Sequence, residues 1–412
     1  MEFTFVHAAD LHIDSPLAGL GLKDAAVAER FARASRAAVD ALIEATIQNK
    51  AAFLVIAGDV FDGDWRDVGT GLFFVEALGR LHKAGVPTVI VRGNHDAGSV
   101  ISRDLPYPGS VRVLASDKAE TVAFEALRVV LHGRSFSARR TSDTFIQSYP
   151  ERRDGWLNIG VLHTGLDGSR GHETYAPCSV DDLRRFGYDY WALGHIHAAE
   201  IVAREPWIVY PGNIQGRSVR ETGAKGAMLV TVADGRIRDV APIALDAARW
   251  AHEALDVSAC EDIAEVLSVI GAALERLHRA GEGRPLAARL TLTGVCAIHP
   301  LLVAGRETLE DDARATGVAI AADCWVEAVK LATRAPPAPS AALSDPDSLD
   351  VGALLASAAD DPEFLRALAQ IAGSVADRLP RELRGEIGGE DPEALARIAA
   401  TARDRLTGEL SS

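Results

Sequence analysis

The feature that most limits the possible folds is the alternation of short apolar runs with longer amphipathic stretches over residues 1–200. The apolar runs are rich in β-branched residues and are expected to be strands, whereas the longer stretches have helical spacing. This alternation predicts an α/β fold. In chain order the pieces are Phe3–Ala8, Asp24–Asn49, Ala52–Ala57, Val68–Ala84, Pro87–Val91, Leu127–His132, Trp156–Leu162 and Tyr188–Leu193.

The strands differ in how apolar they are, which indicates more than one kind of sheet. The first three are largely apolar, as expected when helices cover both faces of a sheet. In contrast, Ala227–Val232 and Arg236–Pro242 flank the turn sequence Ala233-Asp234-Gly235 and indicate a β-hairpin. We therefore expect mixed sheets, two of them stacked between helices in a four-layer αββα sandwich.

The pattern changes after residue 245. Strands at Trp250–Ser258, Pro285–Gly294 and Cys324–Thr333, with a helix at Glu261–Ala280 and a helical stretch before the last strand, indicate a small α+β unit. A Pro/Ala-rich run then predicts an extended linker, and helical spacing returns in the tail. The expected domains are 1–245, a capping domain at 246–334, a linker at 335–346 and a helical C-terminal segment at 347–412.

Composition excludes several classes of protein. Of the 412 residues, 48% are hydrophobic and 25% charged, which is ordinary for a globular chain and excludes collagen, a coiled coil or wholesale disorder. No apolar run reaches the roughly 18 residues that a membrane span needs. The cysteines, at positions 178, 260, 296 and 324, are few and widely spaced. We expect a reduced, cytoplasmic protein.

The net charge of −15 at first argues against a nucleic-acid partner. However, residues 1–250 carry 31 acidic and 28 basic side chains, net −3, whereas residues 251–412 carry 27 and 15, net −12. Bound divalent ions would make the first part more positive still. A polyanionic substrate therefore remains open.

Five segments place metal-ligating residue types directly after predicted strands, where α/β folds build their sites. Together they offer carboxylate, amide and imidazole groups without a thiolate, a donor set that suits manganese, iron or zinc. Seven ligands are too many for one tetrahedral ion, so we expect two metals, with Asp59 as the bridge. Gly58, Gly93 and Gly194 are expected to turn the chain sharply off its strands. The segments are Asp10-Leu11-His12, Gly58-Asp59-Val60-Phe61-Asp62, Gly93-Asn94-His95-Asp96, Leu162-His163-Thr164 and Gly194-His195-Ile196-His197.

These motifs, in this order, resemble the calcineurin-like metallophosphoesterase superfamily. The opening Val6–His12, the Gly58–Asp62 segment and the tract Tyr210–Arg217 are similar to SbcD-type DNA repair exonucleases of the bacterial YhaO-like group. The resemblance covers roughly residues 1–335.

The resemblance implies a role for each site residue. Asp10, His12, Asp59 and His197 would hold one metal, and Asp59, Asn94, His163 and His195 the other. His95 would contact the scissile phosphate and help to expel the leaving group, and Asp96 would orient His95. Asp62 stands where archaeal and eukaryotic relatives carry a histidine that influences exonuclease activity. The reaction implied is phosphodiester hydrolysis.

Several residues outside the motifs carry two open interpretations. Arg217 and Arg220 could grip a phosphate or be solvated surface arginines. His7 and His132 are expected to be structural, whereas His172 could approach substrate. Phe61 and Trp65 could stack a base, although packing against a helix is favoured.

The leading hypothesis is a two-metal exonuclease or endonuclease that acts on DNA ends in DNA repair. Manganese is the expected ion, with magnesium, iron or zinc as alternatives. The resemblance further implies an SbcC-type ATPase partner bound through C-terminal helices, and a homodimer, for which Asp14–Arg36 could serve. The alternatives are a small-molecule phosphodiesterase or phosphatase and a catalytically silent scaffold of the same fold.

Overall fold

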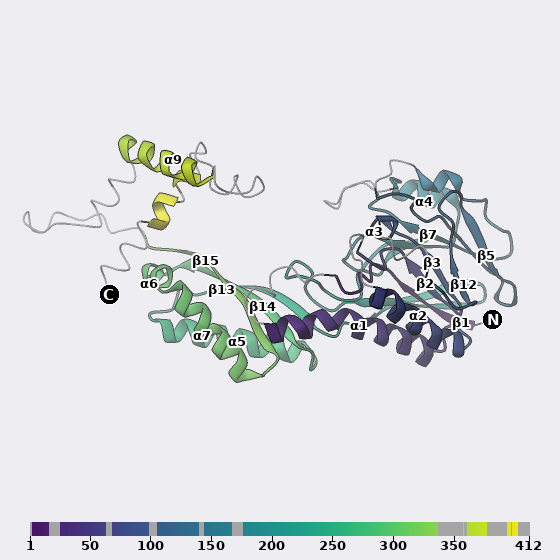
Figure 1. Cartoon of the computed structure of the whole chain (residues 1–412), viewed down its shortest axis with the longest axis horizontal. Coiled ribbons are helices and arrows are strands. Elements are labelled where there is room, and N and C mark those ends of the chain that lie inside the picture. The colour runs from purple at the N-terminus through teal and green to yellow at the C-terminus, as the bar shows by residue number, and fades with distance from the viewer. Residues whose placement is uncertain are drawn as a thin grey trace, which may run out of the picture. The chain divides into compact units, whose positions relative to one another are not determined.

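The computed structural model describes most of the chain (Figure 1). The described residues are 2–15, 25–62, 68–98, 105–139, 144–166, 176–336, 357, 361–376, 394–396 and 398–402. They form two compact units. The first comprises Met1–Ala251 with Gly283–Ala287, and the second comprises His252–Glu282 with Ala288–Ser412.

The first unit contains two six-stranded sheets. The first sheet has the order β12-β11-β1-β2-β3-β4, and the second has the order β5-β6-β7-β8-β10-β9. The strands of the first sheet are β1 (Glu2–Ala8), β2 (Leu54–Ala57), β3 (Thr88–Val91), β4 (Val111–Val113), β11 (Gly226–Ala233) and β12 (Arg236–Ala244). Those of the second are β5 (Glu120–Phe124), β6 (Val129–Gly133), β7 (Leu157–His163), β8 (Tyr190–Gly194), β9 (Glu200–Arg204) and β10 (Trp207–Tyr210).

The period of two along each strand divides its side chains between two cores. On β1, Val6 packs in a core shared with α1 (Ala25–Gln48) and α2 (Val68–Lys83). Its neighbour Phe5 packs in a second core, which also contains Ile159 of β7 and Val209 of β10. That second core therefore lies between the two sheets.

The outer face of the second sheet is covered in the same way. Trp191 of β8 packs there with Leu183 of α4 (Val180–Phe186) and Phe145 of the short helix Phe145–Ser148. The unit is thus the expected sandwich of helices, sheet, sheet and helices. The expected hairpin is also present: β11 and β12 pair antiparallel, and Asp234 and Gly235 between them both have positive φ.

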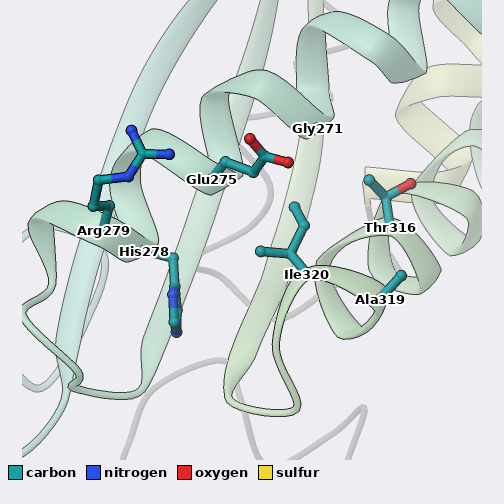
Figure 2. Close-up of a pocket in the computed structure, with 7 residues that line it drawn as sticks. All are labelled: Gly271, Glu275, His278, Arg279, Thr316, Ala319 and Ile320. Carbon is teal, nitrogen blue, oxygen red and sulfur yellow. The ribbon is translucent and has the colours of Figure 1, made fainter.

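The second unit is an α+β structure. Its sheet has the order β13-β14-β15, with β13 at Arg249–Asp256, β14 at Leu286–Val295 and β15 at Cys324–Arg334. The helices α5 (Ile263–Ala280), α6 (His299–Ala304) and α7 (Arg306–Ile320) accompany it, and α7 lies against both α5 and β15. Figure 2 shows the open groove between α5 and α7, lined by Gly271, Glu275, His278, Arg279, Thr316, Ala319 and Ile320.

The C-terminal segment is described only in part. Helix α9 spans Pro362–Ala376, inside the helical segment expected at 347–412, whereas most of the expected linker lies outside the described residues. A search of the described helices finds none with the length and apolar character of a membrane span.

Candidate metal centre

The five predicted motifs come together in the first unit, at the ends of strands from both sheets. Asp10, Asp59 and Asn94 follow β1, β2 and β3, which are parallel neighbours in the first sheet. His163 ends β7, and His195 follows β8, its parallel neighbour in the second. Backbone hydrogen bonds join the loops: the Asp10 N–H donates to Gly58 O (2.9 Å), and the His12 N–H donates to Asp59 O (3.1 Å).

The loops that carry the ligands have unusual backbone angles. The backbone φ values of Asp10, His12, Asp59 and His195 are 53°, 42°, 53° and 99°, in a region that residues other than glycine rarely adopt. Such conformations cost free energy and persist where the surrounding structure fixes them. They turn the chain off each strand so that the side chains converge.

The motif glycines serve two different purposes. Gly58, with φ 98°, makes the sharp turn that the sequence suggested. Positive φ is absent at Gly93 and Gly194, so left-handed backbone is not the reason for glycine there. At these two positions the reason is close approach, because a Cβ on Gly93 would lie 2.1 Å from Asp59 Oδ1, and one on Gly194 would lie 1.9 Å from Ala57 O.

Asp10, His12 and His197 form one group, called position A here, whose ligand atoms lie within 4.8 Å of one another. The Nε2 atoms of His12 and His197 are 3.2 Å apart. Metal–nitrogen bonds are about 2.0–2.1 Å long, so two nitrogen ligands of one ion lie about 3.0–3.4 Å apart at angles of about 90–110°. The geometry of position A therefore fits a cation.

Position B is formed by Asp59, Asn94, His163 and His195. His163 Nδ1 lies 2.9 Å from Ala57 O and must donate its proton there, since a carbonyl oxygen only accepts. In the neutral imidazole, His163 Nε2 is then an acceptor facing two other acceptors, Asn94 Oδ1 at 3.0 Å and Asp59 Oδ2 at 3.2 Å. Three converging lone pairs repel unless a proton or a cation lies among them.

The pKa shifts of His163 and Asp59 also show that position B favours a positive charge. Burial lowers the pKa of His163, but the Asp59 carboxylate outweighs it, and the pKa is raised to about 9. Burial would raise the pKa of Asp59, yet His163 and then His12 hold it far below its usual range. The Asp59 carboxylate therefore interacts electrostatically with His163 of position B and His12 of position A, and its role as a bridging ligand stays a prediction.

The two positions are also connected through backbone. The His195 N–H donates to both carboxylate oxygens of Asp10, at 3.1 and 3.0 Å. The His95 N–H donates to Asp59 Oδ1 at 2.9 Å. The charges of the two carboxylates are therefore partly balanced, and their directions are fixed before any ion binds.

His95 lies at the open side of this cluster, with 43% of its side chain exposed. Its Nδ1 is 3.1 Å from Asp62 Oδ1, and that hydrogen bond raises the pKa of His95. The same Asp62 oxygen accepts from His12 Nδ1 at 2.9 Å. Asp62 therefore orients both a predicted ligand and the predicted catalyst.

Asp96 was expected to orient His95, but the structure gives that contact to Asp62. The buried Asp96 carboxylate instead accepts backbone N–H groups from Val60 (3.2 Å), Phe61 (2.9 Å) and Gly93 (3.0 Å). Burial, with Asp59 nearby, raises the pKa of Asp96 to about 7. Asp96 thus joins the loops after β2 and β3.

Arg217 and Arg220 lie in the loop after β10, with different surroundings. The Arg217 guanidinium lies between two carboxylates, with Nη1 3.5 Å from Asp62 Oδ2 and Nη2 3.4 Å from Glu221 Oε1. The exposed Arg220 donates its backbone N–H to Ser218 Oγ. Phosphate binding by either arginine stays a prediction.

Glu221 is the site residue that sequence reasoning missed. Its Oε1 lies 2.7 Å from His197 Nδ1, and its side chain is largely buried. A signal for it existed, because a ligating histidine commonly donates its second nitrogen to a carboxylate or a carbonyl. Glu221 is the sole acidic residue between positions 211 and 225.

The remaining candidates are mostly structural. His7 is fully buried and bonded to the Tyr190 hydroxyl (3.0 Å) and Leu193 O (3.1 Å), which confirms its structural role. His132 is buried with Nδ1 2.8 Å from Thr121 Oγ1. Phe61 is buried and packs edge-on against Phe74 of α2, as favoured. His172 and Trp65 lie outside the described residues.

Two family models match the chain. The model of the calcineurin-like phosphoesterases matches residues 3–199, and the model of the middle domain of the metallophosphoesterase YhaO matches residues 250–334. The first range contains every predicted metal ligand. The second corresponds to the α+β structure that begins at β13.

Curated relatives agree with these matches. The chain is 34% identical to the uncharacterized metallophosphoesterase YhaO of Bacillus subtilis over 314 residues, which is 75% of this chain and 76% of that protein. It is 28% identical over 230 residues to the DNA double-strand break repair protein Mre11 of Methanopyrus kandleri, covering 50% and 48% of the two chains. It is 22% identical over 241 residues to the protein of the same name from Sulfurisphaera tokodaii, covering 55% and 58%.

Proposed function

Because this chain belongs to the calcineurin-like metallophosphoesterase superfamily, we propose that it hydrolyses phosphodiester bonds of DNA with two divalent ions. The observation that carries the proposal is the presence of two ligand groups, positions A and B, joined by the hydrogen bond from the His195 N–H to Asp10, with the partly exposed His95 beside them. The donor set of carboxylate, amide and imidazole groups suits hard or intermediate divalent ions, and manganese is the ion we propose.

When bound, two such ions would polarise a phosphoryl oxygen and acidify a water molecule. The protein's own residues would do the rest. Asp62 accepts a hydrogen bond from His95 Nδ1, which leaves His95 Nε2 as the ring atom available to the substrate. We assign His95 the role of donating a proton to the leaving oxygen, a task that needs a donor within hydrogen-bond reach of the substrate.

DNA is favoured over a small ester by what lies outside the metal core. The chain continues past the core into the α+β structure that matches the YhaO middle domain, and two DNA repair proteins named Mre11 are among its relatives. We propose that residues 246–334 act as a capping domain that positions DNA over the site.

The expected partners are proposals of the same kind. An SbcC-type ATPase would bind through the C-terminal helices, and Phe364, Ile371 and Val375 of α9 are exposed apolar side chains that such contact would cover. A homodimer through residues 14–36 also remains a proposal. Part of that segment, residues 16–24, lies outside the described residues.

The first experiment is degradation of a linear duplex by the purified full chain with Mn²⁺, with the His95→Gln variant alongside. We expect the parent to degrade the duplex and the variant to be inactive, which would exclude a contaminating nuclease. Single-stranded DNA and bis-p-nitrophenyl phosphate complete the assay. Activity on the small ester alone would favour a small-molecule phosphodiesterase, and inactivity on all three substrates would favour the scaffold.

A further inference from the structure

Histidines at the two metal positions have different hydrogen-bond partners at Nδ1. At position B, His163 donates Nδ1–H to a neutral backbone carbonyl, Ala57 O. At position A, the Nδ1 atoms of both His12 and His197 face carboxylates, those of Asp62 and Glu221. A carboxylate partner makes an imidazole a better ligand and fixes its tautomer. Position A therefore depends on side chains for the tautomers of its two histidines, whereas His163 of position B depends on the backbone.

His197 Nδ1 has two neighbours that would set opposite tautomers. Glu221 Oε1, an acceptor, lies at 2.7 Å, and Arg217 Nη2, a donor, lies at 3.3 Å. If Nδ1 carries the proton, it donates to Glu221, and Nε2 is free to bind a metal. If Nδ1 lacks the proton, it accepts from Arg217, and Nε2 carries a hydrogen and cannot be a ligand.

Hydrogen bonds to Glu221 fix its side chain so that Oε1 faces His197 Nδ1. Its Oε2 accepts the Arg217 backbone N–H at 2.7 Å and Asn213 Nδ2 at 2.9 Å. Those two donors occupy Oε2 and direct Oε1 to His197. The shorter contact, to a charged acceptor, is the stronger one.

We infer that Glu221 is a positioning residue that keeps His197 in its metal-binding tautomer, and that the Arg217 guanidinium becomes a competing donor when the Glu221 carboxylate is removed. The inference rests on the metal centre of the proposed function, but not on DNA as its substrate.

We expect the nearly isosteric change Glu221→Gln to weaken metal binding at position A. Glutamine has one oxygen, and the two donors now at Oε2 would attract it. The NH₂ group would then face His197 Nδ1 and donate to it, which favours the wrong tautomer. A residue needed only for shape would tolerate this change, whereas a residue that sets the tautomer would not.

The test is Mn²⁺ binding to the full chain, measured by calorimetry and by metal content after desalting. We expect the parent to bind two ions per chain. Both Glu221→Gln and Glu221→Ala should bind one ion, at position B, as tightly as the parent and the other about 10- to 100-fold more weakly. Glu151→Ala, a change at an exposed glutamate of the same unit, is the matched control and should equal the parent. Thermal unfolding in EDTA verifies that each variant is folded.

The double variant Arg217→Ala/Glu221→Ala separates tautomer control from simple loss of structure. With the competing donor gone, it should bind the second ion more tightly than Glu221→Ala does. A double variant that binds no better than Glu221→Ala would refute the competition, and a Glu221→Gln variant with parental affinity would refute the role of Glu221. A parent that binds no ion would refute the metal centre itself. A parent that binds two ions but cleaves no DNA would refute only the proposed substrate.

Discussion

Gly93→Ala adds one methyl group beside the metal centre without removing any ligand. The new Cβ would lie 2.1 Å from Asp59 Oδ1 and 2.7 Å from the Asp59 backbone nitrogen. Real Cβ contacts are essentially never shorter than 3.0 Å, so Oδ1 must retreat by about 1 Å. The backbone nitrogen must move as well, and it cannot do so by a change of rotamer. The whole Asp59 loop is therefore expected to shift.

The consequence should appear in metal binding and in catalysis. Asp59 lies where both ions would be held, and a misplacement of about 1 Å at such a site can cost about 100-fold in rate. We expect hydrolysis of bis-p-nitrophenyl phosphate to fall by about that factor. Mn²⁺ affinity should fall by at least about 10-fold, as it does when a supporting group is lost. Calorimetry with Mn²⁺ and initial rates on the small ester measure the two effects.

The matched control is the same substitution in helix α2. A Cβ on Gly79 would meet nothing within 4 Å, so Gly79→Ala should stabilise the fold by about 0.5–1 kcal/mol and leave metal binding unchanged. Urea unfolding of both variants shows whether each is folded. A folded Gly93→Ala variant with parental Mn²⁺ affinity would show that the position of Asp59 does not govern the metal centre.

Three further predictions address the ligands, the ions and the pH dependence of stability. Asp59→Asn should lose bound metal together with activity, whereas His95→Gln should lose activity and keep its metal, as measured by metal content after desalting; loss of both ions from the His95 variant would contradict the division between ligand and catalyst. Mn²⁺ at about 100 times its dissociation constant should raise the free energy of unfolding by about 2.7 kcal/mol per ion, reversibly with EDTA; an unchanged melting temperature would argue against binding to the folded chain. Burial lowers the pKa of His7 to about 3, so between pH 6 and pH 4 the unfolded chain binds a proton at His7 and the folded chain does not. As the pH is lowered over this range, the free energy of unfolding of the parent should fall by about 1.4 kcal/mol per pH unit relative to His7→Gln in urea titrations. Parallel curves for the two proteins would show that His7 titrates normally.

The central strands were predictable because two neighbours and two cores constrain them. Both β2 and β3 are buried on both faces, and their sequences are apolar except for Thr88 at the start of β3. A short apolar run rich in β-branched residues and bounded by turn residues is typical of a fully buried strand. Because these strands pair in parallel, their carboxyl ends lie at the same edge of the sheet, and the motifs that follow them meet there.

Of the four edge strands in the two six-stranded sheets, β12 was predicted through its hairpin turn, but the other three were not predicted. Each of β4, β5 and β9 lies at the edge of its sheet and has a single paired neighbour. On β5, exposed and half-buried residues alternate along Glu120–Phe124, so no continuous apolar run marks it. The pairing that defines such a strand comes from its neighbour rather than from its own composition.

At the site, the spacing of the motifs indicated the ligands but not the groups behind them. A ligand must stand at a strand end, which the sequence shows, whereas the carboxylate behind it can come from any loop that reaches it. Asp62 stands three residues from Asp59 yet contacts His95, and Glu221 contacts His197 from 24 residues away. Asp96, adjacent to His95, turns instead to backbone N–H groups. Adjacency in sequence was therefore a poor guide to these contacts.

The strained loops explain why these carboxylates matter. Left-handed backbone at a residue other than glycine costs about 1–3 kcal/mol, and Asp10, His12, Asp59 and His195 each adopt it. Backbone hydrogen bonds between the loops, such as the Asp10 N–H to Gly58 O, offset part of that cost. They are held by contacts to ligand carboxylates, such as Asp10 accepting the His195 N–H, and by Asp96, which joins the loops after β2 and β3. The groups that would bind the ions thus also hold the backbone that presents them, so a change at one motif should be felt at the others.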